Sequence, residues 1–208
     1  MNITPQYADN NKKERSKGMI LANCSEFERT LALHSAPALL GIKPACLMSL
    51  DRAQADIYNN AQFFNQKAVS RGLKIKILCE CNSRCLMLLY SEKLLEKHLR
   101  NNECAALLEK YGYSRSMPLG QCLERLAERC AQGSDFPHEI GVFLGYPLED
   151  VVGFIKNKGC GYKLCGYWKV YGDVNDASRI FKRYDKCRAF LCNRLNEGMN
   201  IYQALRIS

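Results

Sequence analysis

The stretch Phe136–Tyr171, FPHEIGVFLGYPLEDVVGFIKNKGCGYKLCGYWKVY, decides how the second half of this chain begins to fold. Pro137 suits a first helical turn, where its missing N–H is not needed, and Gly145 suits the left-handed position that ends a helix. Pro147 begins a second helix, and Gly159 ends it. The stretch therefore predicts two short helices in succession.

A strand is predicted directly after these helices. Its residues alternate between an apolar face and a face of cations, aromatics and one cysteine. The first face holds Tyr162, Leu164, Trp168 and Val170, and the second holds Lys163, Cys165, Tyr167, Lys169 and Tyr171. Because the first face is too apolar for an isolated strand, we expect it to join the same sheet as a hairpin at 73–90.

The rest of the chain supplies further elements with the periodicity of helices and strands. We expect a buried strand at 45–50, a helix at 51–71, the hairpin at 73–90, helices between 91 and 131, and a long helix that begins near Asp173. This order predicts the α/β class, on the border of α+β: a small mixed sheet of about four strands, including one hairpin, covered by helices. Residues 1–20 are polar and are predicted to form a flexible tail, and 21–208 to form a single domain.

Four segments, taken together, resemble the domain-of-unknown-function 3793 family. They are LALHSAPALLGIKPACLMSL (31–50), FPHEIGVFLGYPLEDVVGFI (136–155), CGYWKVYGD (165–173) and KCR (186–188). The likeness runs from about Phe27 to Leu195, and four motifs in order make it specific. It implies a small bacterial protein, typically of an anaerobe, and implies no activity or cofactor. The matching positions include His34, Lys43, Pro44, His138, Glu139, Tyr146, Trp168, Lys169, Tyr171, Cys187 and Arg188.

Composition and charge limit the class of protein and suggest a partner. The chain has 208 residues, 47% of them hydrophobic and 25% charged, as in ordinary globular proteins. Its formal net charge is +9, and residues 156–208 hold eleven Lys and Arg but four Asp and Glu. This excess favours an anionic partner, such as a phosphate ligand, a nucleic acid or an acidic protein, and a solvated basic face is the structural alternative.

Twelve cysteines occur in a chain with no secretory signal pattern. No apolar run approaches the roughly 20 residues of a membrane helix. We therefore expect a cytoplasmic protein with reduced thiols and no membrane partner. Cys79, Cys81 and Cys85 lie near the hairpin turn and raise the alternatives of metal binding, redox chemistry or simple packing. Their spacing matches no standard zinc motif, so we assign no metal site.

His138 and Glu139 are the candidate catalytic residues. An HExxH zinc motif would need a second histidine where the chain has Val142, which excludes the common metalloprotease motif. His138 can transfer a proton near neutral pH, or bind a ligand. Alternatively, either side chain satisfies backbone N–H groups at a buried turn.

His34, Lys43, Lys169 and Tyr171 are the candidate ligand-binding residues. Lys43 lies in an irregular loop, where a lysine can bind phosphate or carboxylate, and the alternative is a core histidine beside a surface lysine. Lys169 and Tyr171 belong to the strand face that alternates cations and aromatics. Such a face can bind nucleic acid, or it can be an ordinary solvent face.

The phosphate loop GxxxxGK[ST], the dinucleotide turn GxGxxG and the nucleophile elbow GxSxG do not occur, which argues against the commonest ATPases, Rossmann enzymes and hydrolases. The leading hypothesis is a cytosolic protein that binds an anionic small molecule or cofactor, with His34, Lys43 and His138 in one cleft. Whether it is an enzyme, and with which cofactor, is left open. The alternatives are a nucleic-acid-binding or regulatory module that uses the basic C-terminal quarter, and a metal- or redox-active protein that uses the hairpin cysteines.

Overall fold

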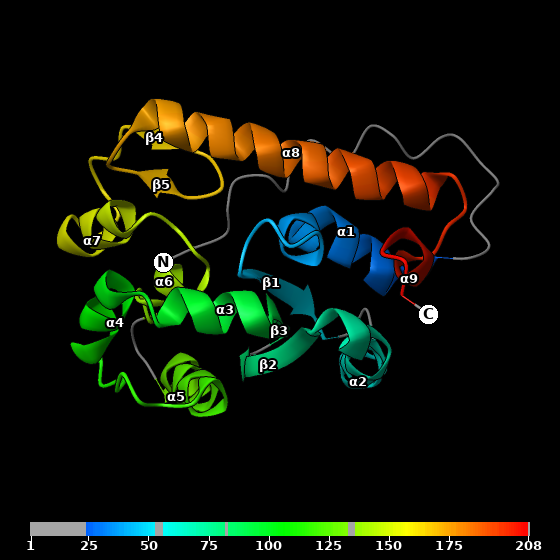
Figure 1. The fold of residues 1–208 in the computed structure, drawn as a ribbon, viewed down its shortest axis with the longest axis horizontal. Helices are drawn as coiled ribbons and strands as arrows, with labels where there is room; N and C mark the ends of the chain where they lie inside the picture. Colours follow the sequence, from blue (N-terminus) through cyan, green and yellow to red (C-terminus); the bar gives the residue numbers. More distant parts are fainter. Residues whose placement is uncertain (1–23, 53–55, 82, 133–135, 208) are drawn as a thin grey trace.

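The computed structural model describes residues 24–52, 56–81, 83–132 and 136–207, so the predicted tail at 1–20 lies outside the described residues. Figure 1 shows the elements in space. In chain order they are α1 (Glu26–Leu39), β1 (Ala45–Asp51), α2 (Ile57–Lys67), the 3-10 helix η1 (Ala68–Arg71), β2 (Leu73–Cys81), β3 (Arg84–Ser91), α3 (Glu92–Leu99), α4 (Asn102–Glu109), α5 (Leu119–Gln132), α6 (Ile140–Phe143), α7 (Leu148–Lys156), β4 (Leu164–Cys165), β5 (Lys169–Val170), α8 (Val174–Asn196) and α9 (Ile201–Ala204).

The main sheet has three antiparallel strands in the order β1-β3-β2. Its central strand, β3, is buried along most of its length because its two faces pack against different helices. Met87 and Leu89 face one core and Leu88 faces the other, as the alternation of side chains along a strand requires. This confirms the predicted mixed α/β fold with a small sheet covered by helices.

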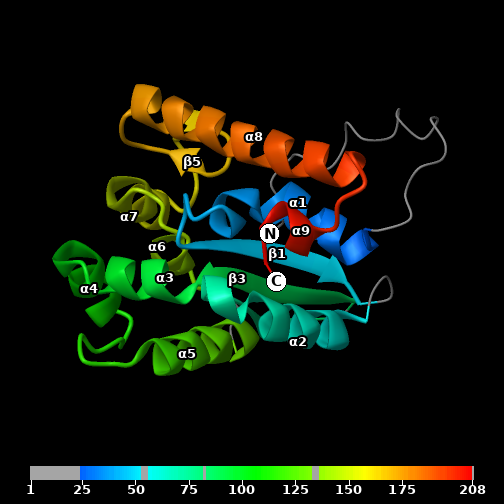
Figure 2. The same ribbon diagram turned by 45° about the vertical axis from the view of Figure 1, so that its right-hand side comes forward.

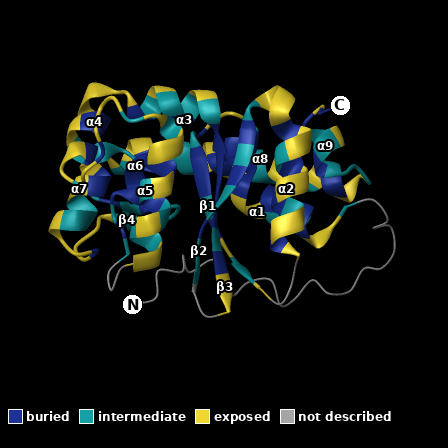
Figure 3. Cartoon of the chain, turned by 90° about the horizontal axis from the view of Figure 1, so that it is seen from below, coloured by how far each residue is buried: buried dark blue, intermediate teal, exposed yellow. Residues whose placement is uncertain are grey.

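Two groups of helices enclose this sheet (Figures 2 and 3). On one face α1, α2, the second half of α8 and α9 pack around Leu31, Phe64 and Leu191. On the other face α3 to α7 pack around Leu95 and Phe143. None of the helices in the described residues combines the length and apolar character that crossing a bilayer needs.

The prediction that a strand at 162–171 joins the sheet of the hairpin is wrong. This segment forms two strands of two residues each, β4 and β5, which pair with each other in a separate sheet. Its apolar residues find other partners: Trp168 and Val170 pack with Ala177 and Tyr184 of α8 in a third, small core. The apolar face is therefore covered by a helix instead of by neighbouring strands.

Two predicted boundaries also differ. Asp51 is the last residue of β1 and lies opposite Arg84 of β3 in the strand register. The N-terminal cap of α2 is Asp56, whose side chain accepts the backbone N–H of Asn59. His138 lies in the turn before α6, whose first residue is Ile140. The predicted starts therefore lie six residues before α2 and three residues before α6.

Candidate functional site

Lys43 lies in a fixed loop between α1 and β1. Gly41 adopts φ +71°, which turns the chain back on α1, and the backbone N–H of Lys43 donates to the carbonyl oxygen of Pro37 at 3.2 Å. Pro44 packs against the connection between α6 and α7, where a Cβ on Gly145 would stand 2.6 Å from the Cγ of Pro44. This close approach docks the Lys43 loop onto the segment that carries Tyr146.

The ammonium group of Lys43 is buried against two aromatic faces. Its Nζ atom lies 4.8 Å from the ring centre of Tyr146 and 5.5 Å from that of Tyr184, and the residue is 5% exposed. Among the described residues, no hydrogen bond or ion pair reaches this ammonium. The rings stabilise the cation, but its three N–H donors have no acceptor there.

The two rings are themselves held in an aromatic framework. Tyr146 stacks on Trp168 with ring centres 4.9 Å apart, and its hydroxyl donates to the carbonyl oxygen of Tyr167 at 3.3 Å. Tyr184 meets the ring of Tyr167 edge-on at 5.1 Å. The indole N–H of Trp168 donates to the buried carboxylate of Asp150 at 2.6 Å. The surroundings of Lys43 are therefore rigid before any ligand binds.

Burial opposes the positive charge of Lys43 around neutral pH. The negative charge that Cys46, Tyr146 and Tyr184 gain on ionising outweighs the burial and raises the pKa of Lys43 above its ordinary value. Within the described part of the chain, no carboxylate neutralises the ammonium of Lys43.

His34 lies on α1 beside α8, on the same side of α8 as Lys43. Its residue is exposed, but partial burial of the ring and the positive charge of Arg188 lower the pKa of His34. Arg188 lies one helical turn beyond Tyr184 and donates to the carboxylate of Asp185 at 2.6 Å. The sequence left open a buried histidine beside an exposed lysine. The structure has the opposite arrangement, because His34 is exposed and Lys43 is buried.

His138 and Glu139 diverge, as neighbours in a tight turn do. Glu139 is fully buried: Arg129 donates to both of its carboxylate oxygens, and the hydroxyl of Tyr113 donates at 3.4 Å. Burial, and then the charge of Glu139, raise the pKa of Tyr113. The ring of His138 instead meets the ring of Phe154 in α7 at 5.0 Å. Glu139 therefore has the geometry of a structural ion pair.

Lys169 and Tyr171 lie on the α7 side of the β4–β5 hairpin. Lys169 donates to the carbonyl oxygen of Gly159 at 2.8 Å, and its Nζ atom lies 5.8 Å from the ring centre of Phe154, the ring that His138 also meets. The hydroxyl of Tyr171 is buried and finds no hydrogen-bond partner among the residues that the structure describes. The structure thus brings His34 and Lys43 together against α8, and places His138 with Lys169 at Phe154. Contacts of the described residues do not join the two groups.

The hairpin cysteines do not share one face of the sheet. Cys85 is buried in the core with α1 and α2, whereas Cys79 pairs with Leu86 across the strands and lies beside Cys130 of α5. Burial, followed by the nearby Cys79, raises the pKa of Cys130 to about 12. The side chain of Cys81 lies outside the described residues. Within the described part of the chain, no group of three His, Cys, Asp or Glu residues could hold a metal ion.

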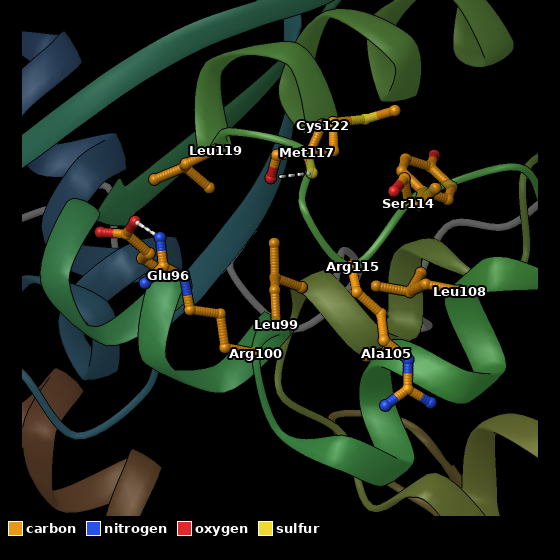
Figure 4. Close-up of a pocket in the computed structure, with 11 residues that line it drawn as sticks. Glu96, Leu99, Arg100, Ala105, Leu108, Ser114, Arg115, Met117, Leu119 and Cys122 are labelled. Carbon is orange, nitrogen blue, oxygen red and sulfur yellow. Dashed lines mark hydrogen bonds and ion pairs between the residues drawn. The ribbon is translucent and has the colours of Figure 1, made fainter.

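Two hollows lie away from all six predicted site residues. A cavity of about 30 Å³ lies between α3, α4 and α5, where Leu99, Leu108 and Cys122 are among its lining residues (Figure 4). It has room for water but not for a metabolite. A wide hollow of about 620 Å³ lies between α2 and β2, beside Asn65 and Lys76. Neither hollow holds a buried charge without a partner.

The four motifs found in the sequence meet in the aromatic framework beside Lys43. Lys43, from the first motif, contacts Tyr146 of the second, which stacks on Trp168 of the third, and Arg188 of the fourth donates to the hydroxyl of Tyr167. A family model described as a protein of unknown function (DUF3793) matches residues 31–205. This chain belongs to the DUF3793 family. The match confirms the resemblance seen in the motifs. No curated protein and no solved structure matches the chain.

Sequence reasoning missed the two aromatic residues that hold Lys43 in this DUF3793 protein. In the sequence, Tyr146 stands out only as a motif position, and Tyr184 belongs to none of the four motifs. A signal does exist in the sequence: GIKP and LGYP each pair a glycine with a proline around one chemically active residue. It indicates two tight loops, but it does not show that Pro44 and Gly145 touch.

Proposed function

We propose that this DUF3793 protein binds an anionic small molecule at Lys43. The observation that carries the proposal is Lys43, a residue that is 5% exposed and whose ammonium has no acceptor among the described residues. Withdrawing an ion from water costs several kcal/mol, and contacts with ring faces return about 1–2 kcal/mol each. A bound anion would supply both the missing acceptors and the missing charge.

The neighbours of Lys43 support an anion over a cation or a neutral ligand. Arg188 and His34 lie on the same side of α8, and the protein as a whole carries a net charge of +9. The carboxylate of Asp185 is occupied by Arg188 and by the hydroxyl of Tyr167. Among the described residues, no acidic side chain is left to neutralise Lys43, and the overall positive charge of the protein raises the local concentration of anions.

No reaction is assigned to the site. Glu139 is sealed by Arg129 and Tyr113, and His138 contacts Phe154 instead of the rings around Lys43. Binding therefore rests on better support than catalysis. Nucleic-acid binding through the predicted strand face has weaker support, because Lys169 donates its N–H groups to a backbone carbonyl.

The experiment measures the binding of inorganic phosphate and sulfate to the full chain by calorimetry and by the shift in melting temperature. We expect both anions to stabilise the wild-type protein. Lys43→Met keeps an unbranched side chain but removes the charge, and it should abolish the shift. Lys182→Met removes an exposed cation of α8 and is the matched control, which should keep the shift. Equal anion binding by wild type and Lys43→Met would refute the proposal.

A further inference from the structure

A second unpaired cation lies along the same helix pair. The Nη2 atom of Arg29, on α1, is buried and has no hydrogen-bond partner in the part of the chain that the structure describes. The guanidinium is close enough to Cys192 of α8 for its positive charge to act on that thiol. Buried donors without partners are uncommon in folded proteins, and each asks for a water, an ion or a ligand.

Arg29 and Lys43 mark the two ends of one seam between α1 and α8, which run alongside each other (Figures 1 and 2). Three electrostatic interactions indicate the register of this pair. The charge of Arg29 acts on Cys192, the charge of Arg188 acts on His34, and the Nζ atom of Lys43 lies 5.5 Å from the ring centre of Tyr184. Each step is four residues of α8, and eight residues of helix at a rise of 1.5 Å span about 12 Å.

Acidic side chains near the seam are already occupied. Glu28 accepts the backbone N–H of Ser25 at 2.8 Å, as the N-terminal cap of α1. Asp185 accepts from Arg188 and from the hydroxyl of Tyr167. Among the described residues, no carboxylate pairs with Arg29 or with Lys43. The seam therefore presents positive charge at both of its ends.

We propose that the ligand is an extended anion of linked phosphates, which lies along the α1–α8 seam and contacts Lys43 at one end and Arg29 at the other. This inference rests on the proposed function, because Lys43 is the shared contact. A single phosphate reaches one end, and a chain of phosphates reaches both. An ammonium binds phosphate as a point charge and a guanidinium binds it through two parallel N–H groups, so linked phosphates suit both ends.

The test titrates the full chain with inorganic phosphate, pyrophosphate, tripolyphosphate and a longer polyphosphate at fixed salt. For the wild type we expect affinity to rise with chain length, by about tenfold or more once both cations are reached, because the second contact becomes intramolecular. Arg29→Met should bind phosphate like the wild type but lose the gain with length. Lys43→Met should lose phosphate and the longer chains together. Lys182→Met is the control and should keep both.

The outcomes separate the two ideas. Phosphate binding at Lys43 without any gain with length would overturn the extended ligand and leave the proposed function standing, whereas no phosphate binding would overturn both. A gain with length that survives in Arg29→Met would also overturn the inference. If Arg29→Met unfolds, Arg29→Lys decides, since it keeps the charge and should keep most of the gain. A single-stranded oligonucleotide that binds more tightly than polyphosphate, and equally in Arg29→Met, would place the contact elsewhere.

Discussion

Glu139 and Lys43 are both buried charges, but the protein treats them in opposite ways. Glu139 is fully buried, and Arg129 and Tyr113 satisfy both of its carboxylate oxygens. Lys43 is 5% exposed and meets ring faces alone among the described residues. The first arrangement neutralises its own charge within the fold, and the second leaves a charge for something else to neutralise.

This contrast separates structural from functional burial better than burial alone does. Breaking a buried ion pair with complete hydrogen bonds destabilises the fold, because removing one partner leaves the other as an unpaired buried charge. A buried ion with no partner is already unpaired, so replacing it with an apolar side chain removes the desolvation cost of that charge. Asp150 belongs with Glu139, because Trp168, Tyr171 and Gly172 all donate to its carboxylate. Substitutions at the three sites should therefore differ in sign as well as in size.

The largest loss is expected for Glu139→Gln. The amide leaves the guanidinium of Arg129 without its charge partner and replaces an acceptor of Tyr113. We expect the free energy of unfolding to fall by about 3 kcal/mol, measured by denaturant titration. Glu128→Gln, an exposed residue of the same region in α5, is the control and should change stability by less than about 0.5 kcal/mol. If Glu139→Gln were as stable as the wild type, Glu139 would not be a structural ion pair and the contrast with Lys43 would fail.

Asp150→Asn should cost about 2 kcal/mol, because one amide oxygen replaces two acceptors that now serve three donors. Trp168 is the only tryptophan of the chain, and its indole N–H binds this carboxylate. Its fluorescence should therefore shift in the variant while the far-ultraviolet circular dichroism stays unchanged. Asp176→Asn, on the exposed first turn of α8, is the control. An unchanged emission spectrum in Asp150→Asn would contradict the assigned role.

Lys43→Met should change stability in the other direction. Without added anion, we expect unfolding to require about 1 kcal/mol more than in the wild type, since the relief of an unpaired charge exceeds the lost contacts with Tyr146 and Tyr184. Both proteins should be compared by denaturant titration after exhaustive dialysis. A loss of 2 kcal/mol or more would mean that Lys43 is structural, like Glu139, and that the contrast is one of degree.

The sequence predicted the local parts of the fold well because their signals are local. Residues 73–80 and 85–90 carry strand alternation around a turn, and the structure forms β2 and β3 there. The strand predicted at 162–171 failed for a physical reason: its apolar face indicates only that it must be covered, not by what. Gly166 permits the hairpin to press against α8, where a Cβ would stand 2.2 Å from the ring of Phe181. The periodicity of apolar residues in the sequence does not predict a tertiary contact of this kind.

The sequence names candidate site residues, but it does not show how they are arranged in space. His34 and Lys43 do lie along the same helix, as expected for parts of one site, but His138 has another neighbour in Phe154. The burial of Lys43 could not be read from a loop bounded by glycine and proline, which usually lies at the surface. It results from Tyr146 and Tyr184, which come from elements more than a hundred residues away.

The smallest expected effect is a pH dependence that tests whether His34 belongs to the Lys43 site. Partial burial and the charge of Arg188 lower the pKa of His34 from its ordinary 6.5, so the folded protein holds the ring neutral at pH 7. The stability that this neutral ring contributes is present above pH 6.5 and is lost as pH falls through the lower, folded pKa. Asp185, bound to Arg188, is the carboxylate on the same stretch of α8.

A bound anion should reverse this shift, because its negative charge favours the imidazolium. Sulfate is the probe, since its charge stays constant over the range, and its affinity should rise by about threefold between pH 8 and pH 6. His34→Gln should flatten that profile without changing the affinity at pH 8, and His138→Gln should leave it unchanged. The same rise in His34→Gln as in the wild type would exclude His34 from the site. The unpaired charge of Lys43 would then act without a titrating neighbour, and the contrast with Glu139 would rest on that lysine alone.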